Sequence, residues 1–212
     1  MLVQDVMQGA VITITPKTVL PEAMRLVRQC GIRHLPVVEN DALVGIVSDR
    51  DLKLAMASPA TSLATHELRY LLDTLTVEEI MTRAVITVGR AVPIEEAARL
   101  MVKEKVSALP VTERGRLVGI VTETDVLQLF LKGMGAGEPS SRIDVRLTED
   151  SGALADLVDA VEASAPEISS IMTLSDRSGH KDVVIRIRSI DARPAITELE
   201  ARGFVVGNPK KG

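Results

Sequence analysis

The sequence predicts an α+β protein in which one unit occurs twice and a different unit occurs once. The first observation is an internal repeat: residues 5–52 align with residues 79–126 without a gap at a constant offset of 74, and 19 of the 48 aligned positions are identical. The second is that strand-like and helix-like apolar patterns alternate in each copy. The third is a glycine-rich stretch at residues 133–141, after which the pattern changes.

Each copy has the predicted order strand, helix, strand, strand, helix. In the first copy a short strand is expected at residues 11–13, and Gly31 is placed to end the helix that follows. The apolar positions of this helix are spaced i, i+3, i+4 and i+7: Ala23, Leu26, Val27 and Cys30. We therefore expect Cys30, the only cysteine, to be a small core residue. Strands at residues 34–39 and 43–47 flank Asn40-Asp41, a dipeptide typical of hairpin turns.

A seven-residue stretch in each copy ends a strand and begins a helix: Gly45–Asp51 and Gly119–Asp125. In each stretch a hydroxyl residue precedes an aspartate by three positions: Ser48 and Asp51, and Thr122 and Asp125. This spacing is that of a capping box, which closes a helix start without any ligand. Alternatively, the hydroxyl and the N–H groups of the helix start bind phosphate, while the carboxylate binds a ribose diol. The stretch alone leaves both interpretations open.

A unit of about 50 residues is close to the lower size limit for independent folding. We therefore expect the copies to bury their sheet faces against each other as a pseudo-twofold pair with two equivalent clefts. Between the copies, residues 58–62 interrupt the preceding helix, because they include Pro59. Leucines with helical spacing follow and predict an amphipathic helix: Leu68, Leu71, Leu72 and Leu75.

The C-terminal region predicts a smaller domain of its own. Ile143, Val145 and Leu147 alternate with charged residues, as in a strand with one buried face. A helix through Leu154 to Val161, paired strands at 167–174 and 182–188, a helix at 191–202 and a strand at 204–206 follow in that order. The order βαββαβ predicts a ferredoxin-like fold.

Composition excludes several classes of function. The net charge is −4 and no run of Lys or Arg stands out, so nucleic acid is a poor candidate partner. The aromatic residues, Tyr70, Phe130 and Phe204, are too few to form a stacking platform for single strands. No apolar run approaches membrane-spanning length and no leader pattern is present. We expect a soluble cytoplasmic protein without a membrane partner.

No set of residues predicts catalysis. His34, His66 and His180 are scattered, and the sequence has neither a Cys–His nor a Ser–His spacing nor a metal-ligand cluster. We expect no enzyme activity, no catalytic residue, no metal and no cofactor.

The repeats resemble the CBS domain pair, or Bateman module. The resemblance rests on Thr13-Ile14-Thr15-Pro16, on Gly31-Ile32-Arg33-His34-Leu35-Pro36-Val37, and on the Gly45–Asp51 stretch with its second copy, and it extends from Met1 to about Lys132. It implies tandem CBS domains whose clefts bind an adenosine nucleotide as a regulatory ligand: AMP, ADP, ATP or S-adenosylmethionine.

The same resemblance implies roles for individual residues. Asp51 and Asp125 would hold ribose hydroxyls, and Ser48 and Thr122 would meet phosphate. Residues bordering the base would be Thr13, Ile14, Leu35, Pro36, Thr87, Ala108, Leu109 and Pro110. Arg33 and His34 would be phosphate contacts, with a solvated strand edge as the alternative. Ser107 and Ala108 replace them in the second copy, and Thr124 replaces Arg50, so we expect two clefts that differ in affinity for polyphosphates.

The C-terminal domain resembles an ACT domain through Gly152-Ala153-Leu154, although the acid and proline usual in that family stand here as Glu149 and Ser151. The resemblance implies edge-to-edge pairing and an amino-acid site at Ser151, Gly152, Ala153 and Leu154; the alternative is that the domain only dimerises. Residues 58–81 are similar to the acetoin utilisation protein B group.

Together these observations predict a non-catalytic regulatory homodimer that senses an adenosine nucleotide and transmits its state through the dimer or the ACT-like domain. The alternatives are an adaptor without a nucleotide ligand and an amino-acid sensor. The expected boundaries are 1–60 for the first CBS domain, 61–77 for a helical linker, 78–133 for the second CBS domain, 134–141 for a flexible linker and 142–212 for the ACT-like domain.

Overall fold

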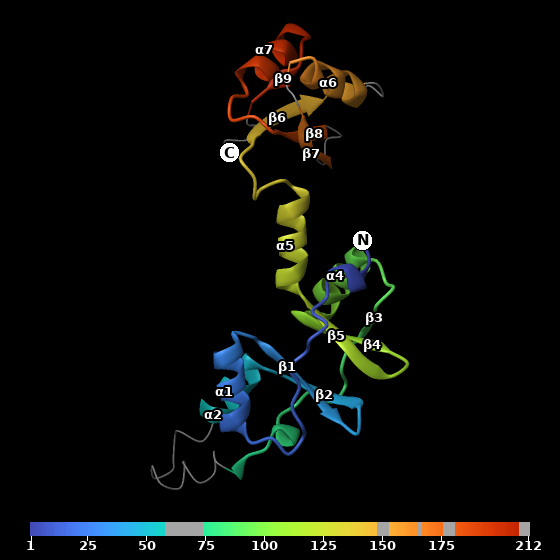
Figure 1. The fold of residues 1–212 in the computed structure, drawn as a ribbon, viewed down its shortest axis with the longest axis vertical. Helices are drawn as coiled ribbons and strands as arrows, with labels where there is room; N and C mark the ends of the chain where they lie inside the picture. The colour runs from blue at the N-terminus through green and yellow to red at the C-terminus, as the bar shows by residue number, and fades with distance from the viewer. Residues whose placement is uncertain (58–73, 148–152, 165–166, 176–180, 208–212) are drawn as a thin grey trace. The chain divides into compact units, whose positions relative to one another are not determined.

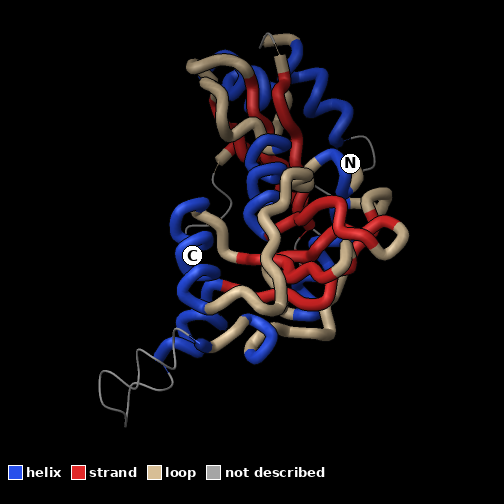
Figure 2. The backbone as a smooth tube through the Cα atoms, turned by 60° about the horizontal axis from the view of Figure 1, so that its bottom comes forward, coloured by secondary structure: helices blue, strands red, loops and turns tan. Residues whose placement is uncertain are grey.

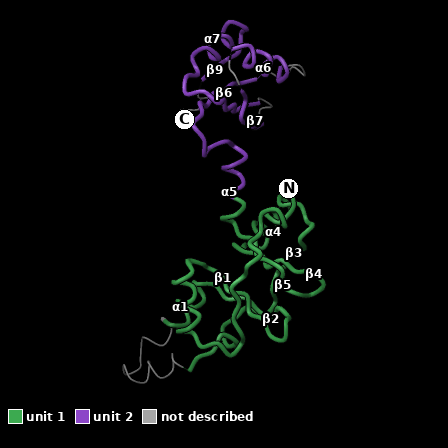
Figure 3. Tube along the Cα trace, viewed as in Figure 1, with its two compact units in different colours: residues 1–126 green, residues 127–212 purple. Residues whose placement is uncertain are grey.

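A computed structural model gives the fold of the chain and describes residues 1–57, 74–147, 153–164, 167–175 and 181–207. The described chain divides into two compact units, residues 1–126 and residues 127–212 (Figure 3). No helix among the described residues is long and apolar enough to cross a membrane.

Unit 1 contains the repeat (Figure 1). The elements of the first copy are the 3₁₀ helix η1 (Val3–Asp5), α1 (Leu20–Cys30), β1 (His34–Glu39), β2 (Ala42–Ser48) and α2 (Asp49–Ala57). Those of the second copy are η3 (Val77–Glu79), β3 (Val88–Gly89), α4 (Ile94–Glu104), β4 (Ala108–Glu113), β5 (Arg116–Thr122) and α5 (Glu123–Gly133), of which α5 runs into unit 2. The first copy has the predicted helix after residue 19, the predicted hairpin and the predicted helix after Ser48. It lacks the strand expected at residues 11–13: the only strand-like pairing nearby in the described chain is a single bridge between Ile14 and Val37.

The two hairpins repeat each other in detail. Val37 pairs with Gly45 and Val111 pairs with Gly119, and each hairpin has a bulge at the next position. Asn40 and Asp41 have φ angles of 49° and 63°, as expected for the tight turn that the sequence predicts. Equivalent positions in the two copies therefore have equivalent backbone environments.

Helix α1 confirms one prediction and corrects another. It ends at Gly31, which adopts a left-handed conformation with φ 63°. Cys30, however, is exposed and not a core residue. The buried face of α1 runs through Leu20, Ala23, Met24 and Val27, so Cys30 lies beside that face in the last turn.

The segment near the start of each copy, here called its leading segment (residues 7–12 and 81–86), packs on the other copy. Gln8 bridges to Ile120 of β5, and Thr82, which follows Gln8 by the same offset of 74, bridges to Ile46 of β2. Met7 packs over Gly119 and Met81 packs over Gly45, so closely that neither glycine has room for a Cβ atom. By contrast, the only direct strand pairing between the copies in the described sheet is Ala42 with Arg116. Exchange of these leading segments thus joins the two copies.

Unit 2 has the element order β6 (Ser141–Leu147), α6 (Ala153–Glu162), β7 (Ile168–Ser175), β8 (Lys181–Ile187), α7 (Arg193–Ala201), β9 (Val205–Val206). Its antiparallel strands lie in the order β7-β8-β6-β9, and α6 and α7 lie together on one face (Figures 1 and 2). Leu157 and Leu199 from the helices are fully buried with Ile185 and Ile187 of β8. The order of elements is the one predicted from the sequence.

Two expectations fall on residues outside the described ranges. They are the amphipathic helix through Leu68, Leu71 and Leu72, and the turn containing Ser151 and Gly152. Leu75, at the end of the first segment, is half-buried against the core of the first copy.

Candidate nucleotide clefts

The strand-to-helix stretch of the first copy forms a closed capping box. The Ser48 backbone N–H and side-chain hydroxyl both donate to Asp51 Oδ2, at 2.8 and 2.6 Å, and the Asp51 N–H donates back to Ser48 Oγ at 3.2 Å. The second copy repeats this with Thr122 and Asp125 at 2.8, 2.7 and 3.3 Å. The capping interpretation is therefore confirmed for both copies.

The same boxes leave one carboxylate oxygen of each aspartate for a ligand. Within the described residues Asp51 Oδ1 accepts no hydrogen bond, and Asp125 Oδ1 accepts only a long one of 3.4 Å from Gln8 Nε2. Such an oxygen can accept hydrogen bonds from the two hydroxyls of a ribose. Capping and ligand binding therefore use different oxygens, and the two interpretations are compatible.

Few backbone N–H groups remain free at these helix starts. Those of Ser48 and Asp51 are used within the box, and the Asp49 N–H donates to the carbonyl of Arg33 at 2.9 Å. In the second copy the Glu123 N–H donates to Ser107 in the same way, at 3.0 Å. The anion-binding role that we expected of these N–H groups is thus reduced, and a phosphate would depend on side-chain cations.

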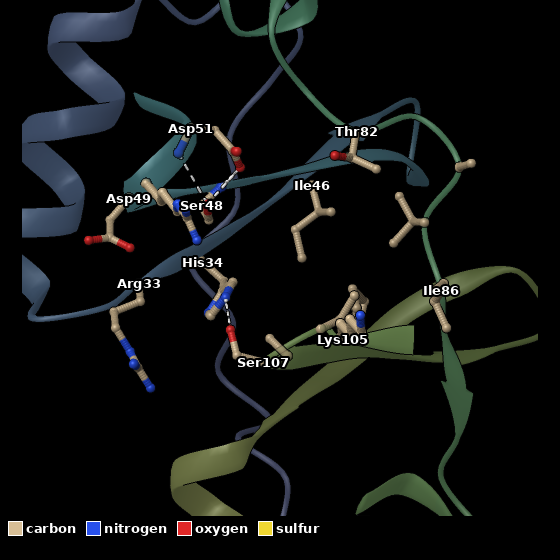
Figure 4. Close-up of a pocket in the computed structure, with 16 residues that line it drawn as sticks. Arg33, His34, Ile46, Ser48, Asp49, Asp51, Thr82, Ile86, Lys105 and Ser107 are labelled. Atoms are coloured by element: carbon tan, nitrogen blue, oxygen red, sulfur yellow. Dashed lines mark hydrogen bonds between the residues drawn. The ribbon is translucent and has the colours of Figure 1, made fainter. Parts of the chain in front are cut away.

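A cavity of about 440 Å³, here called cleft A, lies beside Ser48 and Asp51. Its walls come from both copies: Arg33, His34, Ile46, Ser48, Asp49, Arg50 and Asp51 from the first, and Thr82, Ala84, Val85, Ile86, Lys105, Val106, Ser107, Ala108 and Pro110 from the second. Figure 4 shows Ser48 and Asp51 on one side, Thr82 and Ile86 on the other, and Ile46 between them.

A second cavity of about 350 Å³, cleft B, lies beside Thr122 and Asp125. It is lined by the counterparts of most cleft A residues, shifted by 74: Gln8, Ala10, Val11, Ile12, Gly31, Ile32, Arg33, His34, Ile120, Thr122, Thr124 and Asp125. The expected pair of equivalent clefts is therefore present, and each cleft combines the helix start of one copy with the leading segment of the other.

The two clefts differ in charge. Three cationic side chains line cleft A, namely Arg33, Arg50 and Lys105, whereas Arg33 alone lines cleft B. Asp49 of cleft A is paired with Lys53 at 2.6 Å, and the hydrogen bond from that ammonium group is the main reason why the pKa of Asp49 is lowered. Cleft A is the better match for a polyphosphate chain.

His34 lies between the clefts and lines both. Its Nε2 is 2.9 Å from Ser107 Oγ, the hydrogen bond drawn in Figure 4. Burial, followed by the positive charge of Arg33, lowers the pKa of His34 below its ordinary value of 6.5, although Asp49, Asp51 and Glu123 oppose the shift. At neutral pH the imidazole is therefore uncharged and acts as a hydrogen-bonding group.

The clefts contain some of the predicted contact residues but not others. Arg33, His34, Ser48, Asp51, Ala108 and Pro110 line cleft A, and Thr122 and Asp125 line cleft B. The remaining predicted base contacts do not line either cavity: Thr13, Ile14, Leu35, Pro36, Thr87 and Leu109. Ile14, Leu35 and Leu109 are buried in the core, Thr87 is exposed, and Thr13 borders a separate cavity of about 380 Å³ with Asp41 and Arg116.

Sequence reasoning missed the wall that the leading segments provide. The missed residues of these segments are Gln8, Thr82, 10–12 and 84–86. Lys105, which follows α4 and also lines cleft A, was missed as well. A signal for the leading segments exists, because Ala-Val-Ile-Thr occurs unchanged at 10–13 and at 84–87.

Of the predicted amino-acid site in unit 2, Ala153 is half-buried and Leu154 is exposed at the start of α6. In the described part of the chain, no three His, Cys, Asp or Glu side chains are grouped to hold a metal ion.

The repeat region of the chain matches a known domain family and several known proteins. The model of the CBS domain matches residues 3–58 and 77–132. A CBS domain-containing protein of Dictyostelium discoideum is 37% identical over 142 residues, which are 66% of this chain and 98% of that protein. An inosine-5'-monophosphate dehydrogenase of Korarchaeum cryptofilum is 31% identical over 93% of this chain, but the match spans 41% of that enzyme.

Solved structures match the same region. A CBS domain pair in complex with 5'-methylthioadenosine and S-adenosyl-L-methionine is 33% identical, with a TM-score of 0.54, over 65% of this chain and 98% of that chain. A Vibrio cholerae protein provisionally named acetoin utilization protein (AcuB) is 30% identical over 65% of this chain and 95% of its own, with a TM-score of 0.54. The protein CBSX2 in complex with AMP is 30% identical over 62% and 96%, with a TM-score of 0.52.

Proposed function

The chain belongs to the CBS domain family, and on that premise we propose that it is a non-catalytic regulatory protein that binds an adenosine compound in clefts A and B. One observation carries the proposal. Each cleft places an aspartate, fixed by a capping box and with one oxygen available, beside an apolar wall supplied by the other copy.

The chemistry of cleft A supports a nucleotide in a definite orientation. Asp51 Oδ1 would accept hydrogen bonds from the ribose hydroxyls. The adenine would lie against the aliphatic wall of Ile46, Val85 and Ile86, since no aromatic side chain lines the cavity. The phosphates would then meet the cationic side chains of the cleft. The related structures that hold AMP, or 5'-methylthioadenosine with S-adenosylmethionine, support an adenosine ligand here.

We further propose that the clefts prefer different adenosine compounds. Cleft A, with Arg33, Arg50 and Lys105, would favour ADP or ATP. Cleft B has Thr124 in place of Arg50 and Gly31 in place of Lys105 and would favour ligands with fewer phosphates.

We propose that unit 2 is an ACT-like domain, which the antiparallel order β7-β8-β6-β9 supports, and that the protein acts as a cytoplasmic homodimer. We also propose an amino-acid ligand at residues 151–154, which the sequence resemblance supports. A link to acetoin utilisation is supported by the likeness to the Vibrio cholerae protein. A ligand would act by binding one arrangement of the module better than another.

The proposal is tested by thermal shift on the purified full chain with AMP, ADP, ATP, S-adenosylmethionine, adenosine and a set of amino acids. A ligand at a hundred times its dissociation constant stabilises the folded state by about 2.7 kcal/mol. We expect at least one adenosine compound to raise the melting temperature. A response to amino acids alone would favour the amino-acid sensor, and no response to any compound would favour the adaptor.

A further inference from the structure

Arg33 and His34 are the only residues in the described chain that line both clefts. Their counterparts in the second copy, Ser107 and Ala108, line cleft A alone. The two clefts therefore share one guanidinium group, where a fully symmetric repeat would have two.

The contacts of Arg33 connect it to both helix starts. Its carbonyl oxygen accepts the Asp49 N–H at the start of α2, beside cleft A. Its guanidinium Nη2 donates to Thr124 Oγ1 in the first turn of α5, beside cleft B, at 3.0 Å. In Figure 4 the guanidinium points away from Ser48 and Asp51.

The guanidinium is held weakly enough to move. Arg33 and Thr124 are both exposed, the acceptor is an uncharged hydroxyl, and Arg33 forms no ion pair within the described residues. A phosphate oxygen is a stronger acceptor for a guanidinium than a hydroxyl is, because both partners are charged. A phosphate in either cleft would therefore accept hydrogen bonds from the Arg33 guanidinium in place of the Thr124 hydroxyl.

We propose that Arg33 makes the two clefts antagonistic toward phosphorylated ligands, because its single guanidinium serves a phosphate in cleft A or in cleft B but not in both. This inference rests on the proposed function, since it requires adenosine nucleotides in the clefts. The coupling is reciprocal, as linkage requires. Adenosine, which has no phosphate, binds the two clefts independently.

The test is a calorimetric titration of the full chain with AMP and, separately, with adenosine. Asp125→Ala and Asp51→Ala each weaken one cleft, so AMP titrated below the concentration that fills the weakened cleft gives the affinity of cleft A or of cleft B with the other cleft empty. If either alanine variant unfolds, Asp125→Asn and Asp51→Asn replace them, because the amide oxygen can still accept the capping bonds. In the wild type the second AMP should bind about tenfold more weakly than it binds the same cleft alone, which is about 1.4 kcal/mol.

Arg33→Ser gives the first copy the residue that the second copy has, and it should bring the second AMP to within about twofold of its single-cleft value. Arg28→Ser is the matched control: it removes the same charge from an exposed position on α1 that lines neither cleft, and it should keep the tenfold effect. Thr124→Val frees the guanidinium for cleft A, so AMP should bind cleft A more tightly in the Asp125→Ala background.

Independent AMP affinities in the wild type, or coupling that survives in Arg33→Ser, would overturn the inference and leave the proposed function standing. A stoichiometry of one AMP that stays at one in Arg33→Ser would overturn it as well. Failure of every variant to bind AMP and adenosine would instead overturn the proposed function.

Discussion

The two copies of the repeat share their hairpin register and capping geometry but differ in the charges that they bring to the clefts. Their hairpins share register and bulge position, and their capping boxes agree to within about 0.1 Å in every hydrogen bond. Yet Arg50 of the first copy and Lys105 of the second, at non-equivalent positions, both line cleft A. Because each cleft is lined by residues of both copies, sequence differences between the copies at two separate positions place positive charge in the same cleft. A repeat can thus keep its fold while its two sites diverge.

The ribose aspartates should give the largest effect on binding. Asp51→Ala removes the charged acceptor of cleft A, and we expect a 10- to 100-fold loss of nucleotide affinity there, about 1.5–3 kcal/mol. It also removes the N3 carboxylate of the capping box, which accepts the Ser48 N–H and hydroxyl, and the loss of these hydrogen bonds should cost about 1 kcal/mol of stability. Titration with ADP measures the first effect and chemical denaturation the second. Asp159→Ala, at an exposed aspartate in the middle of α6 and outside both clefts, is the control, and equal losses in the two variants would contradict the assignment.

The glycines beneath the exchanged segments test whether these segments join the copies. A Cβ atom on Gly119 would meet the Met7 side chain and the Gln8 carbonyl oxygen, the latter at 3.1 Å, whereas one on Gly45 would meet only Met81. A side chain can move more easily than backbone, so Gly119→Ala should destabilise by about 1–3 kcal/mol and Gly45→Ala by less. Gly9→Ala has open space and is the control for denaturant unfolding. Stability unchanged by Gly119→Ala would show that the leading segment can leave its site.

Replacing Arg50 by the residue at the equivalent position of the second copy should reduce the difference between the clefts. In Arg50→Thr, which leaves the hydrogen bond between Arg33 and Thr124 in place, we expect the preference of cleft A for ADP over adenosine to fall about tenfold, as one charge-assisted hydrogen bond is lost. Competition binding of ADP and adenosine measures the ratio. The same ratio in wild type and variant would mean that Arg50 does not meet the phosphates.

Salt should separate the clefts by a smaller margin. Raising the ionic strength to about 1 M shortens the Debye length to about 3 Å and weakens exposed charge interactions. ADP affinity should therefore fall more for cleft A than for cleft B, measured in Asp125→Ala and Asp51→Ala respectively. Parallel losses would contradict the charge difference.

The smallest expected effect is on stability at acid pH. Because the pKa of His34 is lowered in the folded state, the unfolded chain binds its proton first as pH falls. The stability that His34 contributes is present above the unfolded pKa of 6.5 and is lost as pH falls through the lower folded value. His34→Ala, which matches Ala108, should flatten this part of a stability profile measured by denaturation at several pH values. An unchanged slope would show that His34 is free to protonate in the fold.

Much of the fold was predictable because its signals are local. Asn40-Asp41 specifies its turn through left-handed φ angles, Gly31 ends its helix, and Ser48 and Asp51 form their box over three residues. The site was less predictable, since the packing of each leading segment on the other copy leaves no local pattern. Thr13 and Thr87 line neither cleft, whereas Thr82 and residues 84–86 line cleft A; which residues border the base stays a prediction.

The sequence does contain one signal for the leading segments that the prediction did not use, namely the Ala-Val-Ile-Thr repeated at 10–13 and 84–87. An alternation pattern shows which side chains share a face but not which copy that face meets. Cys30 illustrates the same limit within one helix: its spacing fits the apolar face, but the helix ends there and the residue is exposed.

A crystal structure of the full chain with ADP tests the central claim most directly. We predict ADP in cleft A, with both ribose hydroxyls on Asp51 Oδ1, the adenine against Ile46 and Ile86, and the phosphates between Arg50 and Lys105. ADP bound in the opposite orientation, with its phosphates at the aliphatic wall, or bound only outside both clefts, would contradict the account.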